Sequence, residues 1–336
     1  MLEDKILVSF KGKNVLVTGG TGLIGRQVVS ILCDAGACVR IVSLDNFKVD
    51  EKAEHLVGDL SNLDYCKEVT KGADFVFHLA GVQGTVATSV SKMASHFVPT
   101  LMVNTNVLEA ARVNKAQKLV FSSSIGAYAD AEFLTEGNAK LDTIPMSFAG
   151  WAKRMTELQI YSYKMQYDLH NYSAVRLGAI YGPGDNFDKE TAMVIPALIS
   201  RIYDKENPLV VWGDGSAVRD FMYSTDAAEG LLRALHFGTD GEMVNIASGA
   251  GTSIRDVVAA LGSFLDFKYE FDSTKPSGEP RRVMDISKAR KLLGFEPSVD
   301  LQAGLRKTWE WFSAHPEDHK KKQNYFEDGF AGKNGR

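Results

Sequence analysis

The segment KNVLVTGGTGLIG, residues 13–25, decides the fold of this chain of 336 residues. It begins with a short β-branched run, which predicts a strand over 13–18, and glycines follow that strand at once. Apolar residues then recur at helical spacing over 23–35, Gly36 predicts the end of the helix, and VRIV at 39–42 predicts the next strand. A strand–turn–helix–strand unit of this kind is typical of a parallel sheet.

The turn between the first strand and the helix has the spacing of a dinucleotide-binding motif, with glycines at 19, 22 and 25. Gly19 permits the sharp turn, Gly22 lets the backbone approach a pyrophosphate, and Gly25 lets the helix pack against the sheet. The N–H groups at the helix start, where Leu23 and Ile24 stand, face the phosphate with the help of the helix dipole. Because a strand precedes the motif and a helix follows it, we predict that these five residues bind a dinucleotide such as NAD.

An acidic residue predicts which dinucleotide is bound. Asp45 lies twenty residues beyond Gly25, just past the second predicted strand. A carboxylate at this place accepts hydrogen bonds from the adenosine ribose hydroxyls and repels a 2′-phosphate, so it favours NAD over NADP. Lys48 is close enough to complicate this choice, and a solvated loop aspartate is the alternative role of Asp45.

The strand pattern continues along the first half of the chain. Further strands are predicted at 54–60, 73–81, 118–124 and 173–180, and helices at about 100–114 and 151–168. Continuous apolar strands indicate burial on both faces. The fold class predicted is therefore α/β, a Rossmann-type doubly wound parallel sheet. We expect its domain over 1–180, with later segments returning to it, a smaller lobe over 181–320 where glycine and proline become frequent, and a polar tail over 321–336.

Composition excludes several classes of protein. The net charge of −4 argues against a nucleic-acid partner, and the basic run at 320–322 fits a solvated tail. Cys33, Cys38 and Cys66 lack metal-ligand spacing, so we expect small buried hydrophobic residues, no disulfides and no metal. Without a signal peptide or an apolar stretch near ~20 residues, we expect no membrane contact and a cytoplasmic location.

Eight motifs in a fixed order carry a resemblance to a known family. They are GGTGLIG (19–25), GDL (58–60), HLAG (78–81), NTNVLEA (104–110), FSSSIGAY (121–128), YGPGDNF (181–187), RDFMY (219–223) and DISKARKLLGF (285–295). Over roughly residues 12–310 the chain resembles the extended short-chain dehydrogenase/reductase family, which contains nucleotide-sugar epimerases, dehydratases and reductases. The motifs together are far more specific than the glycine turn alone.

The resemblance implies further cofactor-binding residues. Asp59 and Leu60 match residues that contact the adenine. Leu79, Ala80 and Gly81 match the loop beside the ribose and phosphates of the cofactor. The smaller lobe is then the nucleotide-sugar-binding lobe.

The resemblance also implies catalytic and substrate-binding residues. Ser124 matches the catalytic Ser/Thr, and Lys153 matches the lysine of the family's Tyr-x-x-x-Lys pair. Arg219 matches the arginine that pairs with the sugar diphosphate, with assistance from Arg281 or Arg282. The chemistry agrees with these roles, because a lysine ammonium lowers the pKa of a tyrosine from near 10 and an arginine grips a diphosphate through two hydrogen bonds.

The tyrosine of that pair is absent, since Ala149 stands four residues before Lys153. Natural loss of the acid/base and deliberate substitution to trap substrate are the two explanations. Because Ser124 and Lys153 are retained, we favour an engineered inactive variant. Either way the chain is expected to bind its substrate better than it converts it. Tyr128 is a conceivable substitute base, although we prefer a packing role for it.

Three further positions narrow the reaction that the resemblance implies. Dehydratases of the family place Asp-Glu after the catalytic Thr, as the acid and base for water loss. This chain has Ile125 and Gly126 there, and because neither can titrate, dehydration is disfavoured. The sequence also resembles GDP-fucose synthase, which needs a Cys and a His to transfer protons during 3,5-epimerisation. This chain has Gly126 and Met193 at the matching positions, so 3,5-epimerisation is disfavoured. The surviving prediction is an NAD-dependent nucleotide-sugar oxidoreductase acting by hydride transfer at C4, a dehydrogenase or ketoreductase, on a GDP-sugar. A sugar 4-epimerase and a non-catalytic NAD-binding regulatory protein are the alternatives, and a homodimer through the helices near 100–114 and 151–168 is expected.

Overall fold

The computed structural model describes residues 2–82, 91–139, 142–189 and 191–322. Within these residues, seven parallel strands form the central sheet in the order β12-β7-β5-β4-β1-β2-β3. Their bounds are β1 Asn14–Thr18, β2 Cys38–Ser43, β3 Glu54–Val57, β4 Phe75–His78, β5 Lys118–Ser124, β7 Tyr172–Leu177 and β12 Met243–Ile246.

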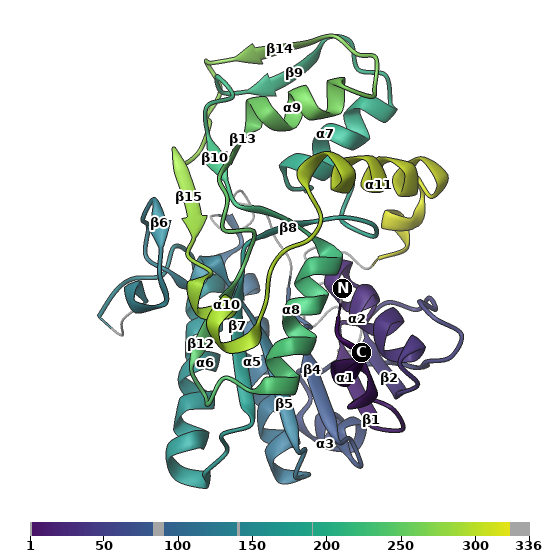
Figure 1. The fold of residues 1–336 in the computed structure, drawn as a ribbon, viewed down its shortest axis with the longest axis vertical. Coiled ribbons are helices and arrows are strands. Elements are labelled where there is room, and N and C mark those ends of the chain that lie inside the picture. The colour runs from purple at the N-terminus through teal and green to yellow at the C-terminus, as the bar shows by residue number, and fades with distance from the viewer. Residues whose placement is uncertain (1, 83–90, 140–141, 190, 323–336) are drawn as a thin grey trace.

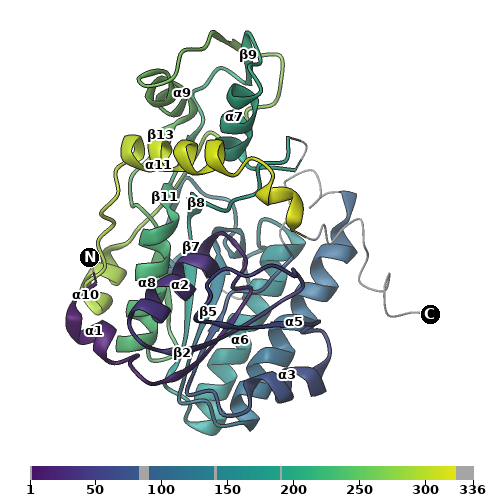
Figure 2. The ribbon, with the colours of Figure 1, turned by 90° about the vertical axis from the view of Figure 1, so that its right-hand side faces the viewer.

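Helices cover both faces of this sheet (Figures 1 and 2). On one face α2 (Leu23–Asp34) packs against α8 (Ser224–Phe237), and α1 (Asp4–Val8) and α10 (Ser287–Leu293) lie beside α8. On the other face α5 (Met93–Val113) packs between α3 (Leu63–Thr70) and α6 (Phe148–Tyr167). A parallel sheet with helices on both faces is the predicted Rossmann-type fold, which is thereby confirmed.

The order of the strands marks the place where a ligand binds. β1 lies between β2 and β4, so the chain leaves β1 in one direction to form β2 and later returns to the other side to form β4. In open parallel sheets, ligands bind outside the carboxyl ends of the strands at such a switch point. The glycine turn at 19–25 begins directly at the end of β1.

A smaller lobe lies beyond the carboxyl ends of the strands, at the top of Figure 1. Its helices are α7 (Val194–Tyr203), α9 (Ile254–Gly262) and α11 (Leu301–Ala314). Its short strands are β8 Ala179–Tyr181, β9 Leu209–Trp212, β10 Val218–Arg219, β11 Phe221–Tyr223, β13 Thr252–Ser253, β14 Tyr269–Asp272 and β15 Arg281–Met284, and β6 Phe133–Leu134 pairs with β15. The lobe has a buried apolar cluster of its own, which includes Phe187, Ile199, Leu261 and Phe312.

The structure differs from the predicted elements mainly at their ends. The strand expected over 173–180 is divided at Gly178, because β7 ends in the central sheet and β8 pairs with β11 instead. A side chain at Gly178 would meet Ala247 at 3.0 Å, so the close approach of two chain segments explains the break. α5 and α6 begin earlier than predicted, at Met93 and Phe148, and the Ser147 hydroxyl caps α6 by accepting from Gly150 N.

Two further expectations about side chains are wrong. Cys33 and Cys66 are buried as expected, but Cys38 is exposed because it is the first residue of β2, where the strand leaves the core. Lys322 is not simply solvated, since its Nζ donates to Gly184 O at 2.5 Å and burial lowers its pKa to about 8. The rest of the expected tail, from 323 onward, lies outside the described residues.

Candidate functional site

The glycine turn has the geometry that a dinucleotide cradle requires. Gly19 adopts φ +70°, and a Cβ on it would lie 2.8 Å from Ala80 Cα, so the turn touches the loop after β4. A Cβ on Gly25 would lie 2.2 Å from Gly19 O. Gly22 is the N-cap of α2 and offers no side chain to the first N–H groups, which Leu23 and Ile24 begin. These residues therefore fit a pyrophosphate at the start of α2.

Asp45 lies just past β2 and beside the same turn. Its Oδ2 accepts a hydrogen bond from Thr21 Oγ1 at 2.6 Å, and Ser43 Oγ donates to the Asp45 carbonyl at 3.1 Å. The carboxylate is thus fixed next to the glycine turn on a half-buried residue. This is the place that the sequence predicted for a ribose-binding acid.

The next strand ends supply the adenine side of the predicted site. Asp59 Oδ1 accepts from Ser61 N at 2.8 Å, and Leu60 is buried. Asn106 Nδ2 of α5 donates to Leu60 O and to Ser61 O, at 3.3 and 2.7 Å. The GDL segment is therefore tied to α5 at the carboxyl edge of the sheet.

The loop after β4 connects the glycine turn to Lys153. Thr18 Oγ1 accepts from the N–H groups of Leu79 and Ala80, both at 3.2 Å, which places this loop over Gly19. Next along the loop, a Cβ on Gly81 would lie 3.6 Å from Lys153 Nζ. The structure thus brings the predicted cofactor loop and the predicted catalytic lysine together.

Lys153 is held at the end of β5. Its Nζ donates to Ser122 O at 2.8 Å and lies 4.8 Å from the centre of the Phe121 ring. Burial lowers the pKa of Lys153 to about 8, against the opposing effect of Glu157. The amine is thus a cation at neutral pH with a smaller margin than an exposed lysine has.

Ser124 and the start of α6 meet around Gly126. A Cβ on Gly126 would lie 3.6 Å from Ser124 Oγ and 3.8 Å from Ser147 Oγ, so both hydroxyls border one small region. Gly150 packs so closely here that a Cβ on it would overlap Gly126 O. Ala149 precedes Gly150 in the first turn of α6. The position of the absent tyrosine therefore lies in the turn that packs against the segment following Ser124.

Tyr128 cannot replace the missing phenol in this arrangement. Its side chain is fully buried, and its OH donates to Asn245 Oδ1 at 2.6 Å. Burial raises the pKa of Tyr128 to about 12. A phenol that is buried, bonded and harder to ionise than usual is a packing residue, as we preferred from the sequence.

The three predicted arginines divide into two sets. β10 and β15 pair in parallel, with Arg219 opposite Arg282 and Val218 opposite Arg281. Arg219 Nη1 donates to Val218 O and Glu279 O, at 2.8 and 2.7 Å. Burial and the nearby Arg282 both lower the pKa of Arg219. Two guanidinium groups thus come together on neighbouring strands, as a diphosphate site requires.

Arg282 and Arg281 differ in their surroundings. Arg282 Nη2 lies 2.9 Å from Asp130 Oδ1 and 3.9 Å from Glu279 Oε1. Arg281 is exposed and lies near Gly251 together with Val218. The geometry therefore favours Arg282 over Arg281 as the companion of Arg219.

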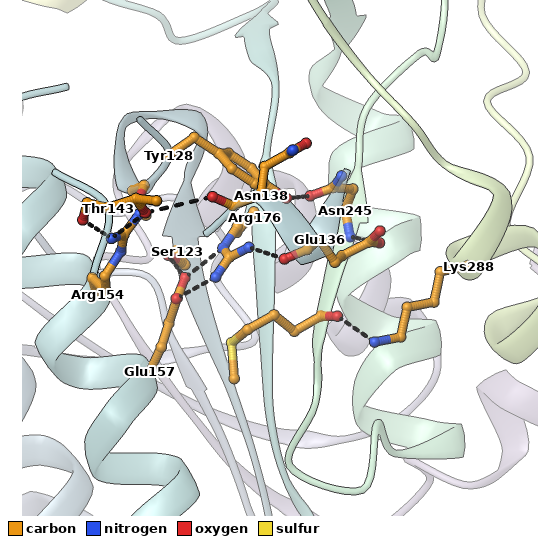
Figure 3. Close-up of polar contacts among 12 residues, drawn as sticks. Ser123, Tyr128, Glu136, Asn138, Thr143, Arg154, Glu157, Arg176, Asn245 and Lys288 are labelled. Atoms are coloured by element: carbon orange, nitrogen blue, oxygen red, sulfur yellow. Dashed lines mark hydrogen bonds and ion pairs between the residues drawn. The ribbon is translucent and has the colours of Figure 1, made fainter. Parts of the chain in front are cut away.

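Sequence reasoning missed a buried ion pair that begins one helical turn beyond Lys153. Glu157 and Arg176 form a buried ion pair at 2.6 Å, and Ser123 Oγ donates to Glu157 at 2.5 Å (Figure 3). The signal was present in the sequence, because Arg176 interrupts the continuous apolar strand SAVRL and Glu157 follows Lys153 by one helical turn.

The chemistry available to the site comes from hydroxyls, one lysine and arginines. Within the described residues no group of three or more His, Cys, Asp or Glu side chains could hold a metal ion. None of the helices in the described ranges is long and apolar enough to cross a membrane. Gly126 and Met193, which stand where the resemblance predicted a Cys and a His to be needed, offer no group that transfers protons.

Comparisons with known proteins identify the family of the chain. The model of the NAD dependent epimerase/dehydratase family matches residues 15–247. A putative UDP-glucose 4-epimerase of Methanocaldococcus jannaschii is 31% identical over 88% of this chain and 97% of its own. A probable GDP-L-fucose synthase of Oryza sativa is 29% identical over 90% of this chain and 92% of its own.

Solved structures show the same likeness. The UDP-glucose 4-epimerase of Thermotoga maritima, solved with UDP-glucose, superimposes with a TM-score of 0.79 at 30% identity, over 90% of this chain and all of the other. The family model covers both the glycine turn and the segment that carries Lys153. The chain therefore belongs to the NAD dependent epimerase/dehydratase family, an enzyme family whose cofactor is NAD.

Proposed function

We propose that this chain is an NAD-dependent nucleotide-sugar oxidoreductase that transfers hydride at C4 of the sugar, on a GDP-sugar, and that Ala149 disables it. The observation that carries the proposal is one continuous set of contacts at the carboxyl edge of the sheet. It runs from the glycine turn through the loop of Ala80 and Gly81 to Lys153, whose partner Ser122 stands two residues before Ser124.

The residues act in three ways in this reaction. The glycine turn and Asp45 hold the dinucleotide, which when bound accepts or returns a hydride at the sugar carbon. Ser124 Oγ holds the substrate hydroxyl, and Arg219 with Arg282 hold the diphosphate. Lys153 supplies the positive charge that favours a phenolate, but at position 149 there is no phenol to ionise.

The missing proton acceptor limits the rate rather than the binding. General acid–base groups contribute typically 10²–10⁴-fold to a rate. The hydroxyls of Ser124 and Ser147 border the site, but serine hydroxyls ionise far above neutral pH. We therefore propose that the chain holds both ligands and turns over slowly, as expected of a site disabled by substitution.

A sugar 4-epimerase is the second candidate. It is favoured by two of the relatives named above, one described as a UDP-glucose 4-epimerase and one as a putative UDP-glucose 4-epimerase. The GDP-sugar rests on the GPGDNF segment and on the similarity to a GDP-L-fucose synthase. Both candidates use the same residues, so the product separates them.

The test restores the tyrosine and follows reduced nicotinamide by absorbance. Ala149→Tyr and the parent chain are each given NAD and a panel of GDP-, UDP- and dTDP-sugars, with products analysed by mass spectrometry. We expect one sugar to react at least about 100-fold faster with the tyrosine variant. A loss of two hydrogens identifies oxidation, and an unchanged mass with altered chromatography identifies epimerisation. If the tyrosine variant converts no sugar on the panel, the proposal is wrong.

A second measurement addresses the non-catalytic alternative. A regulatory protein that binds only NAD has no use for paired arginines in the lobe. We expect GDP to raise the melting temperature beyond the increase caused by NAD alone, because any ligand of the native state stabilises it. An identical melting temperature with and without GDP, UDP or dTDP would favour the regulatory protein.

We also propose that the protein is a homodimer through α5 and α6. Apolar side chains remain exposed on both helices at helical spacing, including Val98 and Met102 on α5 and Leu158, Tyr161 and Met165 on α6. The two helices pack against each other, and we propose that these side chains form one surface. Burial of that surface against a second copy explains its composition.

A further inference from the structure

Glu157 and Arg176 form a buried ion pair next to the residues assigned to catalysis. Arg176 donates to Glu157 through two nitrogens, Nε to Oε1 at 2.8 Å and Nη2 to Oε2 at 2.6 Å. The two side chains are only 3% and 5% exposed. A pair so deeply buried is a poor source of stability by itself, because both charges lose their hydration.

The pair joins three elements of the site, as Figure 3 shows. Glu157 belongs to α6, one turn beyond Lys153, and Arg176 belongs to β7. Glu157 Oε1 also accepts a hydrogen bond from Ser123 Oγ at 2.5 Å, which joins α6 to the end of β5. Ser123 stands between Ser122, whose carbonyl accepts from Lys153, and Ser124, the proposed ligand of the substrate hydroxyl.

The other side of the pair is anchored as well. The Arg176 guanidinium lies 4.5 Å from the centre of the Tyr128 ring, and the Tyr128 OH donates to Asn245 of β12. Arg154 of α6 donates to Ala127 O and, at 2.5 Å, to Thr143 O. The network therefore ties α6 to the ends of β5 and β7 through side chains that do not reach the reacting atoms.

The charges that face Lys153 single out Glu157. Burial lowers the pKa of His78 of β4 to about 3 and also lowers that of His96 of α5, and the charge of Lys153 lowers both further. Both rings are therefore neutral at neutral pH. Glu157 is the carboxylate that opposes the effect of burial and raises the pKa of Lys153.

We infer that Glu157, held by Arg176 and bonded to Ser123, is a positioning residue that fixes Lys153 of α6 relative to Ser124 at the end of β5. The role in catalysis rests on the proposed function, whereas the effect on the lysine charge does not. The Glu157 carboxylate accepts a hydrogen bond from Ser123 of β5 and also raises the pKa of Lys153. The same carboxylate therefore fixes α6 against β5 and favours the protonated amine.

The test titrates Lys153 in the chain as it stands. Lysines are reductively methylated with ¹³C, and the Lys153 resonance is identified by its loss in Lys153→Met. In Glu157→Gln we expect the pKa of Lys153 to fall by about one to two units, the size that Coulomb's law gives for two charges separated like Cβ atoms one helical turn apart, roughly 6 Å, at an effective dielectric of about 20.

The matched control removes a similar ion pair far from the site. Glu229 and Arg233 of α8 lie 2.9 Å apart and are 12% and 6% exposed. Glu229→Gln should lower the melting temperature but leave the Lys153 titration unchanged. An equal shift, or none, in the two variants would overturn the inference.

A neutral replacement covers the case in which Glu157→Gln does not fold. Glu157→Gln with Arg176→Gln leaves no unpaired buried charge, and we expect a smaller fall in the pKa of Lys153. No fall in a folded double variant would overturn the inference as well.

Kinetics in the Ala149→Tyr background separate this inference from the proposed function. Adding Glu157→Gln should lower kcat at least about 10-fold, change the sugar KM less than two-fold and shift the pH profile toward lower pH. Ser123→Ala should lower kcat without shifting the profile, because it keeps the charge. If Ala149→Tyr itself is inactive, the proposed function fails, and the titration alone decides the role of Glu157.

Discussion

Replacing Lys153 by methionine should stabilise the protein near neutral pH. Methionine keeps the unbranched stem of the side chain and removes the buried ammonium. The lysine has its ordinary pKa of 10.5 in the unfolded chain and a pKa of about 8 in the folded protein. Burial of the charge therefore costs stability, and this cost is fully present below pH 8 and fades as the pH rises toward 10.5.

The two pKa values set the size of the effect. Their difference of about 2.5 units corresponds to a cost of about 3 kcal/mol at pH 6.5 and about 1 kcal/mol at pH 9.5. Loss of the hydrogen bond to Ser122 O offsets about 1 kcal/mol at either pH. We expect Lys153→Met to gain about 2 kcal/mol in unfolding free energy at pH 6.5 and almost nothing at pH 9.5.

The assay is urea unfolding of both proteins, stripped of dinucleotide, at the two pH values. Lys291→Met provides the control, since Lys291 is an exposed lysine on α10 and its replacement should change little at either pH. A gain that does not depend on pH would mean that packing, not charge burial, governs this position. A loss of stability at pH 6.5 would refute the argument that burial of the Lys153 ammonium lowers the unfolding free energy.

Three further predictions follow from the geometry of the site. Gly25→Ala should weaken NAD binding at least about 100-fold in calorimetry because its Cβ would lie 2.2 Å from Gly19 O, whereas Gly262→Ala, with nothing within 4 Å, should bind NAD normally. A Kd for NAD of Gly25→Ala within two-fold of that of the parent would contradict NAD binding at the glycine turn. Arg219→Met should raise the Kd for GDP or UDP by about 10- to 100-fold and Arg281→Met by less than three-fold, and equal effects would contradict the proposed pairing of Arg219 with Arg282. Met165→Glu, at a side chain 65% exposed, should convert a dimer into a monomer in analytical ultracentrifugation, and an unchanged mass would place any interface elsewhere.

The sequence predicted the parallel sheet well because its signals are local. The β-branched run before Gly19 and the helical spacing after Gly22 depend only on neighbouring residues, and β1, α2 and β5 lie where predicted. The break at Gly178 was missed because it depends on Ala247 and Asp220, which are distant in the chain. The early start of α6 depends on a serine cap, a signal that was present at Ser147 but not used.

The candidate site was predictable to a different degree in its different layers. Ser124, Lys153 and Arg219 stand in motifs, so the resemblance predicted a ligand-binding role for each of them, and these roles stay predictions. The supporting layer has no motif of its own, since Glu157 meets Arg176 across nineteen residues and Tyr128 meets Asn245 across 117. Side chains that pair over such separations are found only once strand order and register are known.

The same division explains how the site can be assembled with an alanine at position 149. Lys153 is held by Ser122 O, and the start of α6 is held by Ser147 and by the contact of Gly150 with Gly126. None of these contacts involves the Ala149 side chain. A phenol at that position would act on the substrate rather than support the fold, so its loss should remove chemistry and leave the architecture in place. For this reason one substitution, Ala149→Tyr, should suffice to restore turnover, and a need for compensating changes around Gly126 would show that the site has adapted to the alanine.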